Sequence, residues 1–248
     1  MATIGLIAAM ADESNALLRQ TKKWERIKLG RYTGHRFELP SLTCILVTSG
    51  MGIRRAAEAT RALVAEYSPQ MLISFGIAGA VEPELEIGDV VAAESFCPLD
   101  ADALGPCLPL AALPETAREA AVHVLAGRGA RLFKGTAITT GGSQVSSQRI
   151  GALPHPILEM ETAGIARVAA EKNITLFSLR AISDGPRAPI PFDLGEVMDA
   201  DANLQMGKLL KAILRNPKLL LQARQMNRNS RTAEDNAAMA LIAVVNAL

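Results

Sequence analysis

Residues 159–184 read EMETAGIARVAAEKNITLFSLRAISD, and this stretch decides the class of fold. Apolar residues at helical spacing over 162–172 predict a helix, and the apolar run over 175–182 predicts a buried strand. Two carboxylates precede the helix and a third follows the strand. In α/β proteins such positions lie at the carboxyl edge of the sheet, so we expect the three acids to converge on one cleft there.

The alternation of strands and helices continues on both sides of this stretch. We predict further strands at 3–8, 43–48, 71–75, 89–94 and 131–140, and helices at 11–20, 53–66, 116–126, 202–214 and 218–248. Repeated strand-then-helix units predict a single α/β domain over 1–248, with a mixed, largely parallel central sheet flanked by helices. Within it we expect a core at 1–200, a helical tail at 202–248 and an irregular Pro-rich loop at 96–113.

Composition excludes several classes of protein. Apolar residues make up 49% of the 248, charged residues 21%, and the net charge is +1, as in a soluble globular protein. Balanced charge and 4% aromatic residues argue against a nucleic-acid partner. The apolar N-terminus has no basic leader and meets acids at 12–13, so we predict a core strand there and not a signal peptide.

The three cysteines Cys44, Cys97 and Cys107 lack the spacing of a metal site. Their odd number argues against a disulfide framework and favours a reducing compartment, the cytoplasm. Cys97 and Cys107 share the Pro-rich loop, but spacing alone fixes no geometry.

Each acidic group has a functional and an ordinary structural interpretation. Glu159 and Glu161 bracket Met160, and carboxylates beside an adaptable thioether suit a sugar, but acids at a helix start also suit its dipole. Asp184 would be a general acid if burial raised its pKa, or it could cap the Asp-Gly-Pro turn that it opens. Glu13, after the first strand, could polarise a water or be a solvated first-turn acid.

Two glycine clusters follow strands, Ser49-Gly50-Met51-Gly52 and Gly76-Ile77-Ala78-Gly79. They would let backbone N–H groups approach a ligand, phosphate or water, or would serve tight strand-to-helix packing. Neither matches the dinucleotide fingerprint or the Walker loop.

A set of short motifs occurs in order between residues 3 and 185: Ile4-Gly5-Leu6-Ile7-Ala8-Ala9-Met10 with Glu13, Ser49-Gly50-Met51-Gly52, Ser74-Phe75-Gly76-Ile77-Ala78-Gly79, Ile87-Gly88-Asp89-Val90-Val91, Thr140-Gly141-Gly142, Glu159-Met160-Glu161 and Arg180-Ala181-Ile182-Ser183-Asp184. Any one of them is unspecific. Together they resemble the nucleoside phosphorylase/nucleosidase superfamily, and within it the methylthioadenosine/S-adenosylhomocysteine nucleosidase group.

The resemblance implies cleavage of the N-glycosidic bond of a 5′-substituted adenosine, with Asp184 protonating the purine at N7 and Glu13 orienting the attacking water. Glu161 would accept hydrogen bonds from the ribose, Met160 would pack against it, and Glu159 would support the sugar site. No metal or cofactor is needed for this chemistry.

The remaining parts of the implied site are less chemical. Ser183 would orient the general acid, and Gln144 and Val145 lie where the family binds the base. Gly76 and Ile77 stand near the water or phosphate position, where Ile77 replaces the small hydroxyl residue of many hydrolytic members. A homodimer is expected, because in the family the loop near 96–113 reaches the neighbouring subunit's site.

Four alternatives stay open. The wording of the glycine motif and the tail after Leu214 resemble the hopanoid-associated branch, which is thought to remove adenine from an adenosyl lipid. Phosphate could replace water as nucleophile, with Arg54, Arg55 and Arg180 as its candidate ligands. The chain could also be a non-catalytic purine-nucleoside-binding module. The basic, leucine-rich stretch over 208–231 allows membrane contact, although a packed C-terminal helix is the ordinary interpretation.

Overall fold

The computed structural model describes residues 2–100, 103–141, 150, 153–189 and 218–248. The strands are β1 (Ala2–Ala8), β2 (Glu25–Leu29), β3 (Tyr32–Leu39), β4 (Leu42–Thr48), β5 (Met71–Ala80), β6 (Val90–Asp100), β7 (Ala103–Leu104), β8 (Leu108–Pro109), β9 (Leu132–Thr139), β10 (Pro156–Glu159) and β11 (Thr175–Asp184). The helices are α1 (Ala11–Arg19), α2 (Ile53–Tyr67), α3 (Glu115–Ala126), α5 (Thr162–Lys172) and α8 (Lys218–Ala247).

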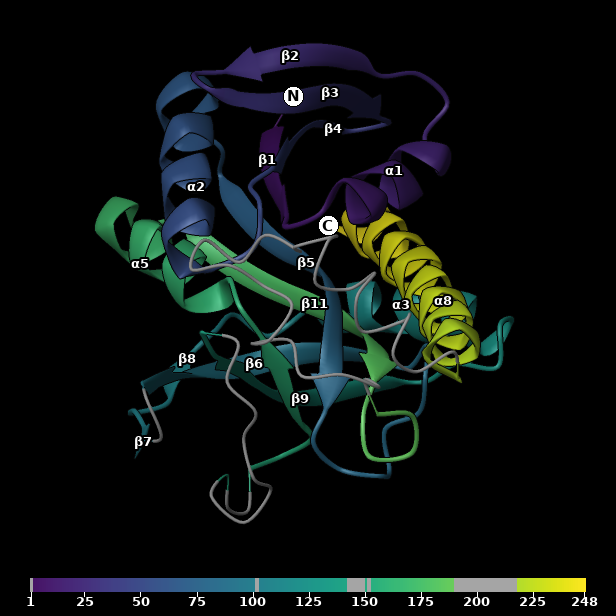
Figure 1. The fold of residues 1–248 in the computed structure, drawn as a ribbon. Helices are drawn as coiled ribbons and strands as arrows, with labels where there is room; N and C mark the ends of the chain where they lie inside the picture. Colours follow the sequence, from purple (N-terminus) through teal and green to yellow (C-terminus); the bar gives the residue numbers. More distant parts are fainter. Residues whose placement is uncertain (1, 101–102, 142–149, 151–152, 190–217) are drawn as a thin grey trace.

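The strands form one mixed sheet in the order β10-β9-β6-β11-β5-β1-β4-β3-β2 (Figure 1). β4, β1, β5 and β11 are mutually parallel neighbours, whereas β2, β3 and β4 are antiparallel, as are β6 and β11. β10 pairs with β9 and also with β5, so β5, β11, β6, β9 and β10 close into a ring. The predicted α/β class with a mixed sheet is confirmed, with more antiparallel pairing than expected.

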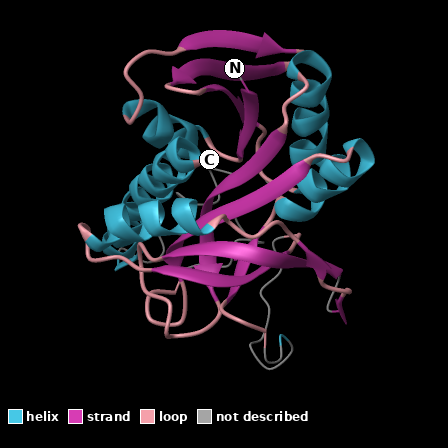
Figure 2. Cartoon of the chain, turned by 180° about the vertical axis from the view of Figure 1, so that it is seen from behind, coloured by secondary structure: helices cyan, strands magenta, loops and turns pink. Residues whose placement is uncertain are grey.

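Helices cover both faces of the sheet, α1, α3 and α8 on one and α2 and α5 on the other (Figures 1 and 2). Successive strand residues point to opposite faces, so Ile4 and Leu6 of β1 join one core cluster and Ile7 joins the other. Buried residues of α8 belong to the first cluster: Ala233, Ala237, Ala238, Ala240, Leu241, Val244 and Val245. These apolar residues of α8, between Ala233 and Val245, are therefore part of the core of the protein.

The structure corrects the sequence analysis at several elements. The strands β2, β3 and β10 were not predicted, and the supposed irregular loop at 96–113 contains the end of β6 together with β7 and β8. Cys97 and Cys107 form a disulfide, although the odd number of cysteines argued against a disulfide framework, because β8 folds back alongside β6 and brings them together. The helix predicted at 202–214 lies outside the described residues.

No described helix combines the length and the hydropathy that crossing a membrane requires.

Candidate active site

The ends of β5, β10 and β11 meet at one place in the fold. In the sheet register, Gly79 of β5 lies opposite Leu158 of β10 and opposite Asp184 of β11. β10 ends at Glu159, and Glu161 is the residue immediately before α5. The ends of β10 and β11, which carry Glu159 and Asp184, therefore lie on either side of the same stretch of β5.

Glu13 reaches this place from α1. Its Oε2 accepts hydrogen bonds of 2.8 Å from the backbone N–H groups of Ala9 and Met10, and its Oε1 accepts one of 3.0 Å from Ile77. Glu13 is 2% exposed, so it is not the solvated acid of the alternative interpretation. Burial raises its pKa, while Arg180 and the three N–H groups oppose the rise. The result is a fixed carboxylate shielded from bulk water.

A buried ion-pair cluster joins the two glutamates to Arg180. Arg180 Nη2 lies 3.1 Å from Glu159 Oε2 and 3.3 Å from Glu161 Oε2. Glu161 Oε1 also accepts a hydrogen bond of 3.1 Å from the N–H of Gly52. Burial raises the pKa of Glu161 to about 7; Arg180 opposes this, and the charges of Glu159 and Glu13 add to it. When all three are ionised, the carboxylates of Glu13, Glu159 and Glu161 outweigh the single charge of the guanidinium, which suits a cationic reaction centre.

Glu159 is bound by protein donors at both of its oxygens. Its Oε2 accepts the N–H groups of Glu161 at 2.9 Å and Thr162 at 2.8 Å, and the Thr162 hydroxyl at 2.9 Å. The hydroxyl of Thr139 donates to its Oε1. Glu159 therefore orients Arg180 and the start of α5, which is a supporting position. Sequence reasoning missed Thr139 and Thr162, although both lie within one residue of motifs that it had singled out.

Asp184 ends β11 in a partly buried position. The hydroxyl of Ser183 lies 2.7 Å from Asp184 Oδ2 and 3.3 Å from the carbonyl oxygen of Ala78. Burial raises the pKa of Asp184, and the hydrogen bond from Ser183 partly offsets the rise. A Cβ atom at Gly79 would lie 2.7 Å from Asp184 Oδ1. An alanine at that position would therefore require the carboxyl group to shift.

Two glycines of β5 contact the two candidate catalytic groups. At Gly76, where φ is +152°, a Cβ atom would overlap the Glu13 carboxylate and lie 2.8 Å from Arg180 Nη1. Gly79 is the corresponding contact of Asp184. Gly76 and Gly79 are three residues apart on the strand, a separation of about 10 Å along its axis.

The other predicted residues are placed as follows. Met160 is partly buried between the two glutamates, and Gln144 and Val145 lie outside the described residues. Arg180, considered above as a phosphate ligand, is instead 1% exposed and bound to carboxylates, and its Nη2 donates to Ser74 Oγ at 2.8 Å. Arg54 lies 3.4 Å from Glu58 on the exposed side of α2.

With this geometry in place, comparison with known proteins identifies the family. Residues 3–215 match the family described as the Phosphorylase superfamily. The chain belongs to this superfamily. A 5′-methylthioadenosine/S-adenosylhomocysteine nucleosidase from Oceanobacillus iheyensis is 32% identical over 77% of this chain and 90% of its own length. An aminodeoxyfutalosine nucleosidase from Campylobacter jejuni is 27% identical over 85% of this chain and 98% of its own.

Solved structures of superfamily members agree with the fold. The 5′-methylthioadenosine/S-adenosylhomocysteine nucleosidase of Neisseria meningitidis, in complex with methylthio-immucillin-A, aligns over 100% of both chains with a TM-score of 0.73 and 22% identity. The corresponding enzyme of Colwellia psychrerythraea, in complex with adenine, gives a TM-score of 0.74 at 19% identity, over 100% of this chain and 96% of its own. At these identities the likeness establishes the fold.

Proposed function

We propose that this protein is a nucleosidase that hydrolyses the N-glycosidic bond of a 5′-substituted adenosine and releases adenine. The observation that carries the proposal is the convergence of Glu13, Glu161 and Asp184 on the end of β5. The two relatives named above are nucleosidases, and the chain matches each of them over most of its length. This similarity supports the same class of reaction.

In the proposed reaction, Asp184 gives its proton to N7 of the purine while the bond between the base and C1′ breaks. The bonding electrons leave with the base, which departs neutral, and positive charge develops on the sugar. The ionised carboxylate of Glu161 stabilises that charge at short range. Glu13 accepts a proton from the attacking water, whose oxygen bonds to C1′ and completes the free sugar.

Water is the proposed nucleophile because Glu13 already occupies the donors that an anion would require. The N–H groups of Ala9, Met10 and Ile77 all donate to its carboxylate. A phosphate dianion entering there would face the charge of Glu13 at close range, and Arg180 is bound to two other carboxylates. The geometry therefore favours hydrolysis over phosphorolysis.

A single assay tests the nucleophile. Purified protein incubated with methylthioadenosine in phosphate-free buffer should release adenine together with the free 5-methylthio sugar, both identified by mass spectrometry. Added phosphate should neither accelerate the reaction nor produce a sugar 1-phosphate. A strict phosphate requirement would make the protein a phosphorylase.

The role of Asp184 is tested by Asp184→Asn, which keeps the shape but removes the proton donor. We expect kcat to fall by about 10²–10⁴-fold while adenine binding, measured by calorimetry, persists. Asp235→Asn is the control, because Asp235 makes a partly exposed ion pair of 2.8 Å with Arg19 on α1. Binding of nucleosides without any turnover by the unaltered protein would instead indicate a non-catalytic binding module.

The identity of the 5′ group is best determined by comparing kcat/KM among candidate substrates. We propose methylthioadenosine or adenosylhomocysteine as first candidates, and aminodeoxyfutalosine as the next because the Campylobacter jejuni relative is named for it. A matched series of kcat/KM values on these three and on an adenosine with a lipid-like 5′ chain separates them. The hopanoid-associated alternative requires the last compound to be the preferred substrate.

We also propose that the protein is a cytoplasmic homodimer. Support for the dimer comes from the resemblance of the chain to the nucleosidase family. Light scattering coupled to gel filtration measures the mass directly, and a monomer at micromolar concentration would contradict the dimer.

A further inference from the structure

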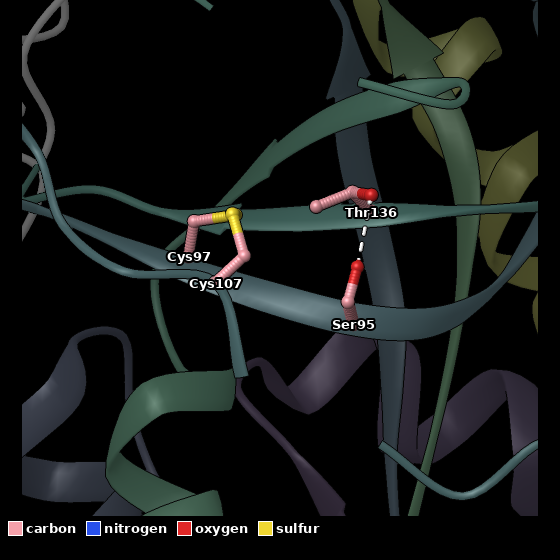
Figure 3. The surroundings of a disulfide bond; sticks show 4 residues. All are labelled: Ser95, Cys97, Cys107 and Thr136. Atoms are coloured by element: carbon pink, nitrogen blue, oxygen red, sulfur yellow. Dashed lines mark hydrogen bonds between the residues drawn. A yellow bond between two sulfur atoms is a disulfide. The ribbon is translucent and has the colours of Figure 1, made fainter. Parts of the chain in front are cut away.

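The disulfide between Cys97 and Cys107 joins β6 to the segment that folds back along it (Figure 3). In the register of β6 and β8, Ser95 lies opposite Pro109 and Phe96 lies opposite Leu108. The next pair across the two strands is therefore Cys97 and Cys107, whose Cα atoms are 4.2 Å apart. Residues 103–110 form the clamp segment, which the disulfide links covalently to β6.

The two cysteines differ in accessibility. Cys97 is completely buried, whereas Cys107 is exposed on the clamp segment, beside the exposed Leu108. Thiol–disulfide exchange requires access to one sulfur, so an incoming thiolate meets Cys107. Cys44 is the remaining cysteine and is buried in β4, where burial raises the pKa of its thiol to about 12. It is therefore inert in the same reaction.

Strand pairing connects the disulfide to Glu159, the residue proposed to support the sugar site. In the register of β6 and β9, Cys97 lies opposite Ile138 and Pro98 lies opposite Thr139, the residue whose hydroxyl donates to Glu159. A separate apolar cluster connects the same elements: Leu99 of β6, Leu104 of the clamp segment, Ile138 of β9 and Leu158 of β10. Leu158 immediately precedes Glu159. The clamp segment thus packs over the strand ends that hold the glutamates.

We propose that Cys97 and Cys107 form a reversible thiol–disulfide exchange site, and that its reduction releases the clamp segment and weakens the sugar site. A small-molecule thiol or a dithiol protein is the reductant. Its thiolate attacks Cys107 Sγ, the S–S bond breaks, and Cys97 leaves as a thiolate that takes up a proton. A second thiolate attacks the external sulfur of the mixed disulfide, and Cys107 leaves as a thiolate that takes up a proton. Two external thiols thus become one external disulfide while the protein gains two thiols. The corresponding external disulfide reverses the change.

Two measurements test the exchange without any turnover. In protein equilibrated with a disulfide-containing buffer, alkylation and peptide mapping should find Cys97 and Cys107 protected, and both should be labelled after treatment with dithiothreitol. Hydrogen exchange should then accelerate severalfold at Gly105 and Leu110, whose N–H groups donate to Pro98 at 2.7 Å and Glu94 at 2.9 Å. Labelling of both cysteines under oxidising conditions, or unchanged exchange after reduction, overturns the proposal.

The effect on the sugar site rests on the proposed nucleosidase activity and has its own readout. Reduction should raise KM for methylthioadenosine severalfold, and Cys107→Ser should show the raised value in both buffers. Cys44→Ala should respond to reduction as the unaltered protein does. Equal KM and kcat in the two redox states would overturn the link to the site. Because labelling and hydrogen exchange need no substrate, their outcome is separate from that of the nucleosidase assay.

Discussion

At the scale of single residues, Glu161 lowers the stability of the protein whenever it is ionised. Its pKa is raised by burial from the ordinary value of 4.5 to about 7. Between these two values the folded protein binds a proton that the unfolded chain has already lost. The contribution of Glu161 to the free energy of unfolding is therefore largest below a pH of about 4.5. It declines as the pH rises from about 4.5 to about 7, by at most about 3 kcal/mol.

Glu161→Gln should remove this pH dependence, because a neutral amide does not titrate. Measured as Tm, the unaltered protein should lose stability between a pH of about 5 and a pH of about 8, and the variant should lose less. The variant should also be inactive at both values, because it lacks the charge that stabilises the sugar cation. An equal pH dependence of Tm in the two proteins would show that burial does not suppress the ionisation of Glu161.

Gly79→Ala tests whether glycine at this position is what leaves room for Asp184. The added methyl carbon would lie 2.7 Å from Asp184 Oδ1, so the carboxyl group must move away from the substrate. We expect kcat to fall by at least tenfold with a small change in Tm, given the sensitivity of catalysis to misplacement of about 1 Å. Gly127→Ala is the matched control, since its Cβ atom meets only Val124 O at an ordinary 3.6 Å. An unchanged kcat in Gly79→Ala would show that the position of the Asp184 carboxyl group does not depend on glycine at residue 79.

At the scale of elements, α2 and α5 pack closely where both begin. A Cβ atom at Gly164 of α5 would overlap the carbonyl oxygen of Ile53, the first residue of α2. Gly52, just before α2, donates its N–H to Glu161, just before α5. The contact between the two helix starts therefore holds the Glu161 carboxylate in place.

Gly164→Ala should separate these helix starts and lower both Tm and kcat, because backbone cannot yield as a flexible side chain can. Ala163→Gly, at the neighbouring position, is the control and should cost only about 0.5–1 kcal/mol of stability through helix propensity. Thermal unfolding and the adenine-release assay, run on both variants, measure the two effects. A Gly164→Ala protein no less stable than the control would contradict the close packing.

The elements also show what the sequence can predict. The core strands were predicted because both of their faces are buried and their residues form continuous apolar runs. β2 was not predicted because it is an antiparallel edge strand with Glu25, Arg26 and Lys28 among its five residues. β10 begins with Pro156 and has only four residues, so the strand is too short to give a periodic signal.

The same limit applies to the candidate site. Carboxylates after strands were recognisable from sequence, because strand ends gather at one edge of a sheet. The partner of these acids was not, because nothing in the run around Arg180 tells which way a long side chain points. Its inward orientation depends on Glu159 and Glu161, which are about twenty residues away along the chain and adjacent only after β10 and β11 have paired with β5.

At the scale of the whole molecule, α8 and the sheet share one core, so we propose that the chain is a single folding unit. Leu241 of α8 is completely buried in the cluster that also contains Phe75 and Leu179. Leu241→Ala should cost about 2–5 kcal/mol of unfolding free energy. The single tryptophan, Trp24, lies beside β2 at the far edge of the sheet and reports on that region by fluorescence.

Urea unfolding followed by Trp24 fluorescence and by far-UV circular dichroism should give coincident transitions, both displaced by the substitution. Leu248→Ala, at an exposed terminal residue, should leave them unchanged. A helical signal that melts before the fluorescence would mean that the C-terminal helix is a separate unit.

The ring of β5, β11, β6, β9 and β10 determines how this molecule can diversify. Every member is hydrogen-bonded to a neighbour on each side, so none can shift outward to admit a bulkier compound without breaking two ladders. The acids at its rim therefore keep a constant spacing. New 5′ groups have to be accommodated by connecting chain outside the ring, where insertions are tolerated. Related proteins could in this way acquire different substrates while retaining identical chemistry.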